Sequence, residues 1–435
     1  PVVRKVKEII LDSLGCQLGG AQLENGRMII EYVRNLGDRS ESSVVGSSFM
    51  RSVADAVLAN ATLAHADELD ESFQTADGTH VGHIAAIVVP VSLAMAEKEK
   101  LSGRQVIQTV VLGYELSAMM ARALGPISVS RRRLWGTYIS GAFGAAAAAG
   151  NMLGLEVPQL RVALGLAAGQ IHPFHTFFGE KEHMLKSLQI GTTTRSGVTA
   201  AYLAKLGYGG PESIMDGPNG IFSILTGGTN SQSPLIGAGS QFELLYTCFK
   251  KYAAGHPIHS PVEGLLRIMA REALSAADIE KLQVKIPTHA LSVVGDSPTP
   301  SLNLPYNLAV AAFDRRVGWE QHTAERQADP QVRALQARIE IIPSAELDEL
   351  EKQESTHPAV VELTTRTGQR FSERVLHPPG DPRNPMSQAE LVEKFYHLAT
   401  KTIAHAQAKE LIERIQVLEE IQDVTELTKL LRIPA

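Results

Sequence analysis

The segment Gly179–Phe222, GEKEHMLKSLQIGTTTRSGVTAAYLAKLGYGGPESIMDGPNGIF, predicts tightly packed helices around a buried cation. Lys186 is the one cation within MLKSLQIG, whose other residues are apolar or small and uncharged. The helical pattern from Gly191 to Ala204 is rich in Gly, Ala, Thr and Ser, so other backbone must approach it closely, and a turn-rich loop follows. A lysine in this setting indicates a buried anion site; the alternative is a lysine whose stem crosses apolar surface to reach solvent.

Length and composition describe a globular chain of two or three domains. The 435 residues exceed one ordinary core, and the chain is 44% hydrophobic and 20% charged. A net charge of −6 and the lack of a long basic stripe argue against nucleic-acid binding. The two cysteines, Cys16 and Cys248, lie outside any CxxC motif, which excludes a zinc ribbon or a disulfide framework. This cysteine usage favours a reducing, cytoplasmic compartment.

The apolar runs are too short to cross a bilayer. Ile84–Ala96 is among the longest, and it contains Pro90. No membrane span is therefore expected, and no signal-peptide pattern is visible.

Helical patterns dominate the chain to about Leu265, without a convincing period-2 strand. An amphipathic helix over 3–17 ends near Gly19-Gly20. The other predicted helices of this region are Ser48–Ala64, Ile84–Glu99, Gly103–Ala123, Ala142–Leu153 and Pro158–Gly169.

The pattern changes near residue 275, where apolar and polar residues alternate as in half-buried strands. The predicted strands are Lys281–Pro287, Ala337–Ile342, Ala359–Thr364 and Phe371–Val375. A helix over Gln331–Gln336 and a turn at Thr365–Gly368 complete a small α+β domain, and Ser387–Leu431 returns to amphipathic helix. We therefore expect a mainly α protein, with a large all-helical domain built from 1–268 and 388–435 and a smaller α+β lid domain over 269–387.

Residues 64–90 combine an acidic turn with histidines at the start of an apolar helix. Glu68 and Asp70 precede His83 in this segment. Carboxylates and imidazoles in this order could form an acid–base pair or hold a metal ion. The alternative is a solvated acidic loop.

Basic and aromatic residues precede the Ala-rich helix. Arg133, Trp135 and Tyr138 lie there, and a helix N-terminus beside arginines favours an anion. A basic surface loop or a subunit contact is the alternative. His172, His175, Glu182 and His183 follow later, but their spacing matches no ordered metal motif.

Two further segments carry candidate residues. FKKYAAGHPIHSPVEG, residues 249–264, places Lys250, His256 and His259 in a loop broken by Pro and Gly. Tyr306 begins a buried helix within SLNLPYNLAVAA, where a core tyrosine is the alternative.

No P-loop, GxGxxG after a strand or GxSxG motif is present, so nucleotide-driven chemistry and serine hydrolysis lack support. Together the candidates suit a small polycarboxylate held by cations, with a base removing a proton next to a carboxylate.

The chain resembles the MmgE/PrpD family nearly end to end. The segments that carry the resemblance are KEIILDSLGCQLGG, HADELDES, GAFGAAAAAGNMLGL, MLKSLQIGTTTRSGVTAAYLAKLGYGGP, KKYAAGHPIHSPVE and SLNLPYNLAVA, in the order typical of the family. The family includes 2-methylcitrate dehydratase, cis-aconitate decarboxylase and iminodisuccinate epimerase. The resemblance implies a helical domain from both chain ends with an α+β lid, a homodimer, no cofactor and a small anionic polycarboxylate as substrate.

The resemblance also assigns site residues. In chain order they fall on Glu68, Asp70, His83, Lys186, Lys250, His259 and Tyr306. Family members commonly have His-Pro where this chain has Trp135-Gly136, and Gly255 stands where a His or Cys is usual, with His256 beside it.

We combine both lines of reasoning into one predicted site without a metal. The predicted catalytic residues are His83, Tyr138, Lys186 and Tyr306. The predicted substrate-binding residues are Glu68, Asp70, Arg133, Trp135, Lys250, His256 and His259.

Trp135 decides the predicted reaction. Dehydration needs an acid for the departing hydroxyl as well as a base, whereas epimerisation needs one proton-transfer group on each face of the carbon. Because the usual histidine is missing, the sequence favours a cofactor-independent epimerase of a small dicarboxylate, resembling iminodisuccinate epimerase. A dehydratase or decarboxylase is the first alternative, and an inactive dimer that binds a metabolite is the second. Retention of Lys186, His83, Lys250 and Tyr306 argues against the inactive form.

Overall fold

A computed structural model describes residues 1–125, 134–174, 184–211, 213–215, 217, 219–226 and 241–434. The chain divides into two compact units. The first comprises the described parts of Pro1–His175, Met184–Thr247 and Ser387–Ala435, and the second comprises Cys248–Met386. Each unit is described by itself below.

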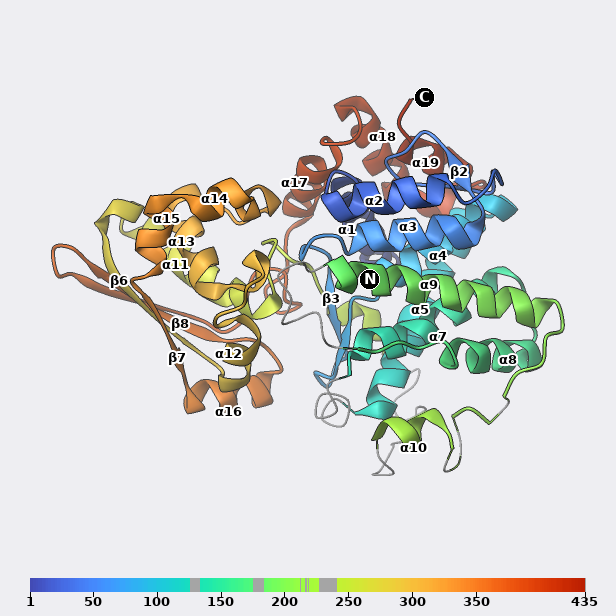
Figure 1. Ribbon diagram of the computed structural model, residues 1–435, viewed down its shortest axis with the longest axis horizontal. Coiled ribbons are helices and arrows are strands. Elements are labelled where there is room, and N and C mark those ends of the chain that lie inside the picture. The colour runs from blue at the N-terminus through green and yellow to red at the C-terminus, as the bar shows by residue number, and fades with distance from the viewer. Residues whose placement is uncertain are drawn as a thin grey trace. The chain divides into compact units, whose positions relative to one another are not determined.

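The first unit is a stack of helices (Figure 1). Small and aliphatic side chains form most of its core. Its α-helices are α1 (Val2–Gly20), α2 (Glu24–Arg34), α3 (Val53–Ala64), α4 (Ala85–Glu99), α5 (Gly103–Leu124), α7 (Gly136–Met152), α8 (Val157–Ala168), α9 (Met184–Lys205), α10 (Ile221–Thr226), α17 (Gln388–Ala399), α18 (His405–Gln416) and α19 (Thr425–Thr428).

Helix α9 packs against α3, α7 and α8, and two of its glycines set the spacing. A Cβ at Gly191 would lie 2.5 Å from the carbonyl oxygen of Leu58 in α3. A Cβ at Gly197 would lie 2.5 Å from Cβ of Ala145 and 2.8 Å from the backbone nitrogen of Ala146 in α7. The prediction that other backbone closely approaches this helix is confirmed. The close approach holds α9, and with it Lys186, against its neighbours.

Both chain ends build the first unit, as predicted. Helix α17 packs against α1 (Figure 1). Gly15 and Gly19 of α1 face Phe395 and Leu398 of α17, with distances of 3.2 Å and 3.1 Å from an added Cβ to the nearest side-chain atoms. The glycines leave the room that these larger side chains occupy.

The first unit is mainly helical but contains short strands that the sequence analysis missed. They are β1 (Ser42–Ser43), β2 (Met50–Arg51), β3 (Ser72–Gln74), β4 (His80–Gly82) and β5 (Thr247–Cys248), whose second residue is counted with the second unit. The order in the three-stranded sheet is β4-β3-β5, and β3 pairs antiparallel with β4. Strands of two or three residues are too short to show a period-2 pattern. The β3–β4 hairpin is nevertheless the element that returns the chain from the acidic turn to His83.

The second unit is an α+β structure around a four-stranded sheet of order β7-β6-β8-β9. Its strands are β6 (Ile279–Ile286), β7 (Ile339–Pro343), β8 (Ala359–Thr365) and β9 (Arg370–Val375). Strand β6 runs parallel to β7 and antiparallel to β8, and β8 and β9 form a hairpin. All four predicted strands are confirmed. The apolar side chains of the alternating pattern, such as Val284 and Val361, lie in the core.

Helices cover this sheet. They are α11 (His259–Arg271), α12 (Thr288–Val294), α13 (Leu304–Asp314), α14 (Ala324–Ala328), α15 (Pro330–Gln336) and α16 (Ala345–Glu354). Helix α11 packs on β8 and β9 (Figure 1). At the contact, a Cβ added at Gly264 would lie 3.0 Å from Cγ2 of Val361. The compact unit therefore begins at Cys248, earlier than the predicted boundary at 269. The sequence pattern of α11 is helical, but the helix packs its apolar face against the sheet of the second unit.

No helix in the described part of the chain combines the length and apolar character that a bilayer crossing requires.

Candidate active site

The first unit brings together two histidines and one carboxylate, which we call the buried cluster: His65, Asp70 and His83. His65 caps the C-terminal end of α3, and Asp70 follows in the acidic turn. The β3–β4 hairpin then reverses the chain and places His83 just before α4. All three residues are at most 5% exposed.

Asp70 lies between the two imidazoles of the buried cluster. Its Oδ2 is 2.8 Å from Nδ1 of His65 and 3.1 Å from Nδ1 of His83. Nδ1 of His83 is also 2.7 Å from the main-chain carbonyl oxygen of Glu71. A carbonyl can only accept a hydrogen bond, so Nδ1 of His83 carries the proton.

His83 is poised as a base. Burial lowers its pKa to about 4, although Asp70 pulls in the opposite direction. The imidazole is therefore neutral near pH 7. Because Nδ1 holds the proton, Nε2 carries the lone pair and is the nitrogen that can accept a proton. Burial also lowers the pKa of His65.

The two carboxyl groups beside His83 have opposite protonation tendencies. Burial alone would raise the pKa of Asp70, but His65 and His83 outweigh it and hold that pKa below its usual value. Burial raises the pKa of Glu71 well above its ordinary value. Oε1 of Glu71 accepts hydrogen bonds from the backbone N–H of Ala85 at 2.5 Å and the Tyr114 hydroxyl at 3.2 Å. Asp70 orients His83, and Glu71 fixes the start of the helix that follows it.

Lys186 brings the cation to this site. It lies in the first turn of α9, is 3% exposed and forms an ion pair with Glu68. Its Nζ lies 5.5 Å from the centre of the Trp135 ring. That ring is nearly parallel to the imidazole of His83, with centroids 6.4 Å apart. The indole therefore lies near both the base and the cation and limits what can approach them.

Tyr138 supports α9. Its hydroxyl donates a hydrogen bond to the main-chain carbonyl oxygen of Lys186 at 2.9 Å, and the side chain is fully buried. Burial, with the nearby charges of Glu68 and Asp70, raises its pKa above the ordinary value for tyrosine. These contacts favour a positioning role over the predicted proton transfer.

A buried ion pair from the chain ends holds the acidic turn. Nζ of Lys394 in α17 lies 2.6 Å from Oδ1 of Asp12 in α1 and 2.8 Å from the carbonyl oxygen of Leu69. Leu69 directly precedes Asp70, so this lysine anchors the backbone of the site. Lys394 had no signal in the sequence. His65 and Glu71 were given no role, although both lie within the segment HADELDES and Glu71 is one of the acids of the turn.

The buried cluster could present ligand atoms to a metal, since these atoms lie within 4.8 Å of one another. However, Nδ1 of His83 is bonded to a main-chain carbonyl, and the charge of Lys186 opposes positive charge on both histidines. The cluster fits a hydrogen-bonded acid–base system better than a cation site.

The second unit holds the other predicted residues. Lys250 is 1% exposed, and His259 is fully buried at the start of α11, with Nε2 3.3 Å from the Ala254 carbonyl oxygen. The rings of His256 and His259 meet edge-on, with centroids 5.6 Å apart. Arg133 lies outside the described residues.

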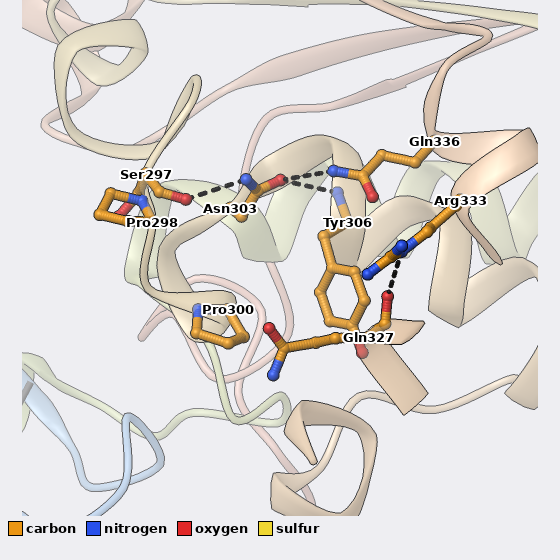
Figure 2. Close-up of a pocket in the computed structure, with 8 residues that line it drawn as sticks. All are labelled: Ser297, Pro298, Pro300, Asn303, Tyr306, Gln327, Arg333 and Gln336. Carbon is orange, nitrogen blue, oxygen red and sulfur yellow. Dashed lines mark hydrogen bonds between the residues drawn. The ribbon is translucent and has the colours of Figure 1, made fainter. Parts of the chain in front are cut away.

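Tyr306 lines a polar cavity of about 210 Å³ in the second unit (Figure 2). The lining residues are Ser297, Pro298, Pro300, Asn303, Tyr306, Gln327, Arg333 and Gln336. The Tyr306 hydroxyl donates to the carbonyl oxygen of Gln321, and burial raises its pKa to about 12. In this structure the hydroxyl thus holds the segment around Gln321.

The fold and the site define a class: a two-unit, mainly helical enzyme whose buried histidine and lysine lie beside carboxylates. The sequence matches the MmgE/PrpD N-terminal domain over residues 1–233 and the MmgE/PrpD C-terminal domain over residues 252–420, so the chain belongs to the MmgE/PrpD family.

Similar curated proteins are cis-aconitate decarboxylases. The one from Mus musculus is 24% identical, over 100% of this chain and 90% of its own length. The one from Aspergillus terreus is 25% identical, over 100% and 92%. The one from Homo sapiens is 24% identical, over 100% and 91%.

Proposed function

We propose that this protein is a lyase that decarboxylates a small polycarboxylate of the cis-aconitate type through proton transfer by His83. The observation that carries the proposal is the buried His83, whose Nδ1 is held by Asp70 and the Glu71 carbonyl, so that Nε2 is the nitrogen that can exchange a proton beside the Lys186 cation. Similarity to cis-aconitate decarboxylases over the whole chain supports this reaction ahead of the epimerase that the sequence favoured.

The chemistry needs one proton at one carbon. When the bond to the departing carboxylate breaks, its electron pair forms a new double bond. The carbon at the far end of the original double bond then takes up a proton. His83 Nε2 first takes up a proton from solvent, because the anionic substrate favours the imidazolium, and then donates it to this carbon. Lys186 holds a substrate carboxylate, and Asp70 stabilises the charged imidazole.

Epimerisation is the second candidate, and Trp135 is the observation that favours it. An indole cannot exchange a proton near pH 7, so the side of the site that it covers lacks the acid expected for dehydration. His83 and Lys186 would then be the two proton-transfer groups. The homodimer and the lack of a cofactor remain predictions from the family resemblance.

Proton NMR of the chelator-treated protein in D2O tests the proposal. The panel contains cis-aconitate, 2-methylcitrate and stereoisomers of iminodisuccinate. Itaconate and CO2 from cis-aconitate, with one deuterium in the product, would support the decarboxylase. Exchange at Cα with interconversion of stereoisomers, and no loss of CO2 or water, would replace it with the epimerase. An alkene from 2-methylcitrate would indicate the dehydratase.

Two pairs of variants assign the residues. His83→Ala should lower kcat/KM by about 10²- to 10⁴-fold, whereas His80→Ala, an exposed histidine on the same hairpin, should change it little. Lys186→Ala is compared with Lys205→Ala at the exposed end of α9. A folded Lys186→Ala protein with full activity would refute the assignment. A wild-type protein without activity across the panel would favour the inactive, metabolite-binding form.

A further inference from the structure

The second unit contains another pair of histidines around one carboxylate, which we call the half-exposed cluster: His289, Glu351 and His357. His289 comes from α12, Glu351 from α16, and His357 from the turn before β8. The exposed fractions of their side chains are 56%, 19% and 24%. None of the three belongs to the predicted catalytic site.

The donor atoms of this cluster converge. Nδ1 of His289 lies 2.7 Å from Oε2 of Glu351, and Nδ1 of His357 lies 3.0 Å from Oε1 of the same carboxylate. One ligand atom from each residue lies within 4.8 Å of the others. The imidazole rings are 5.9 Å apart and tilted by 39°.

From this geometry we propose that the half-exposed cluster binds one divalent transition-metal ion of the Zn²⁺ class. Two imidazole nitrogens and a carboxylate oxygen form a ligand set that Zn²⁺ accepts, with water completing the tetrahedron. Ca²⁺ and Mg²⁺ prefer sets of oxygen ligands, so this donor set disfavours them. Ligands about 2.0–2.2 Å from zinc lie about 3.3–3.5 Å apart. The two nitrogen–oxygen pairs, at 2.7 Å and 3.0 Å, are closer than this, and no ligand atom lies more than 4.8 Å from another. Side-chain rotations that move these atoms by about 1–1.5 Å therefore bring all three to zinc-ligand spacing.

The surroundings support this assignment in two ways. Asp348, one turn before Glu351 on α16, accepts hydrogen bonds from the backbone N–H of Thr288 at 2.6 Å and from its hydroxyl at 2.8 Å. This contact ties the start of α12, with His289, to the helix that carries Glu351, as outer contacts of metal sites commonly do. Partial exposure gives an ion access from solvent, and solvent can receive the displaced protons.

The hydrogen bonds to Glu351 determine which protons must move when a metal ion binds. Each Nδ1 that lies against Glu351 donates its proton in the metal-free state, whichever form the ring takes. Metal binding needs the lone pair at Nδ1, so a neutral histidine shifts its proton to Nε2 and a charged one releases a proton.

Titration of the full chain, purified without a histidine tag and stripped with chelator, tests the site. Zn²⁺ binding is followed by calorimetry, and Co²⁺ is used for its visible absorption in tetrahedral sites. We expect one strong site in the wild type. His289→Ala, His357→Ala and Glu351→Gln should each weaken binding by at least about 10- to 100-fold. His405→Ala, an exposed histidine stacked on Tyr396, should not.

Two results would overturn the proposal. One is the absence of Zn²⁺ binding in the micromolar range. The other is wild-type affinity in all three cluster variants, which would place the ion elsewhere, for example on His65, Asp70 and His83. His65→Ala separates this case, because it should leave the half-exposed site unchanged. The catalytic proposal is independent, since Glu351→Gln should keep wild-type activity whether or not the metal binds.

Discussion

The buried cluster and the half-exposed cluster use the same donor groups for different purposes. In each, one carboxylate lies against Nδ1 of two histidines. Burial lowers the pKa of His83 to about 4, whereas the hydrogen bond to Glu351 raises that of His289. A nearby lysine opposes positive charge in the first cluster. We therefore propose that burial and neighbouring charge, rather than residue identity, suit one cluster to proton transfer and the other to binding a cation.

Replacing the carboxylate of each cluster should give the largest contrast in activity. Asp70→Asn removes the charge that stabilises the imidazolium and leaves the tautomer of His83 less constrained. We expect kcat/KM to fall by about 10²- to 10⁴-fold. Glu351→Gln should leave kcat/KM unchanged within about 2-fold, because Glu351 lies in the second unit outside the buried cluster and substitutions away from functional features usually have small effects. Steady-state kinetics measures kcat/KM for both variants, and thermal unfolding verifies that both are folded. Equal losses in the two variants would contradict the comparison.

The buried cluster should also depend on its support from the chain ends. Lys394→Met leaves the buried carboxylate of Asp12 without its cation, and the loss of one partner of a buried pair costs about 3–5 kcal/mol. We expect a lower temperature for the thermal transition, measured by calorimetry. Lys401→Met, at an exposed position shortly after α17, is the matched control.

A double variant separates charge from packing. Asp12→Asn with Lys394→Met should recover part of the lost stability, because no uncompensated charge remains. If it is as unstable as Lys394→Met alone, the lysine acts through its packing and its bond to the Leu69 carbonyl.

The contributions of His83 and His289 to folding stability should change with pH in opposite directions. The pKa of His83 is about 4 in the folded protein, below about 6.5 in the unfolded chain, so its neutral form supports folding above pH 6.5. That stability, about 3 kcal/mol, is lost as the pH falls from 6.5 towards 4. His289 has a raised pKa, so its smaller contribution is present below pH 6.5 and is lost as the pH rises through that folded-state pKa.

Thermal unfolding from pH 8 to pH 5 measures these signs. His83→Gln should lose less stability on acidification than the wild type, whereas His289→Gln should lose more. The second effect is smaller, because the His289 side chain is 56% exposed and solvent screens its partner. If both substitutions changed the pH dependence of the unfolding temperature in the same direction, the opposite environments assigned to His83 and His289 would be wrong.

The sequence predicted the parts of the molecule that local patterns encode. The four strands of the second unit and the packing of α9 were predicted because alternation and small-residue periodicity persist over whole elements. His83 and Lys186 stood out through their positions beside apolar helices and through the family resemblance. The unit boundary at Cys248 was not predicted, because the helical pattern of α11 does not identify the sheet on which it packs.

The residues that were missed depend on distant parts of the chain. His65 joins His83 only after a hairpin whose strands are too short to recognise. Lys394 reaches the Leu69 carbonyl from 325 residues away. The hydroxyl hydrogen bonds of Tyr138 and Tyr306 also depend on tertiary structure, and they shift the interpretation of both residues from proton transfer towards positioning.

The smallest predicted loss of activity concerns the turn that delivers His83 to its cluster. Gly82 has φ of +118°, and a Cβ there would lie 2.7 Å from Cβ and 3.0 Å from Cα of Thr137. Gly37 has φ of +97° but nothing within 4 Å of an added Cβ. Alanine at either position introduces backbone strain of about 1–2 kcal/mol. Only Gly82→Ala also forces the hairpin away from α7, which should cost about 1–3 kcal/mol more.

Because His83 is the next residue, the displacement should also lower kcat by about 10-fold, whereas Gly37→Ala should leave kcat unchanged. Thermal unfolding and kcat, measured for both variants, separate backbone strain from displacement of the base. If the two alanines cost the same stability and leave kcat intact, then His83 tolerates movement of its turn. The orientation imposed by Asp70 and the Glu71 carbonyl would then suffice to place the base.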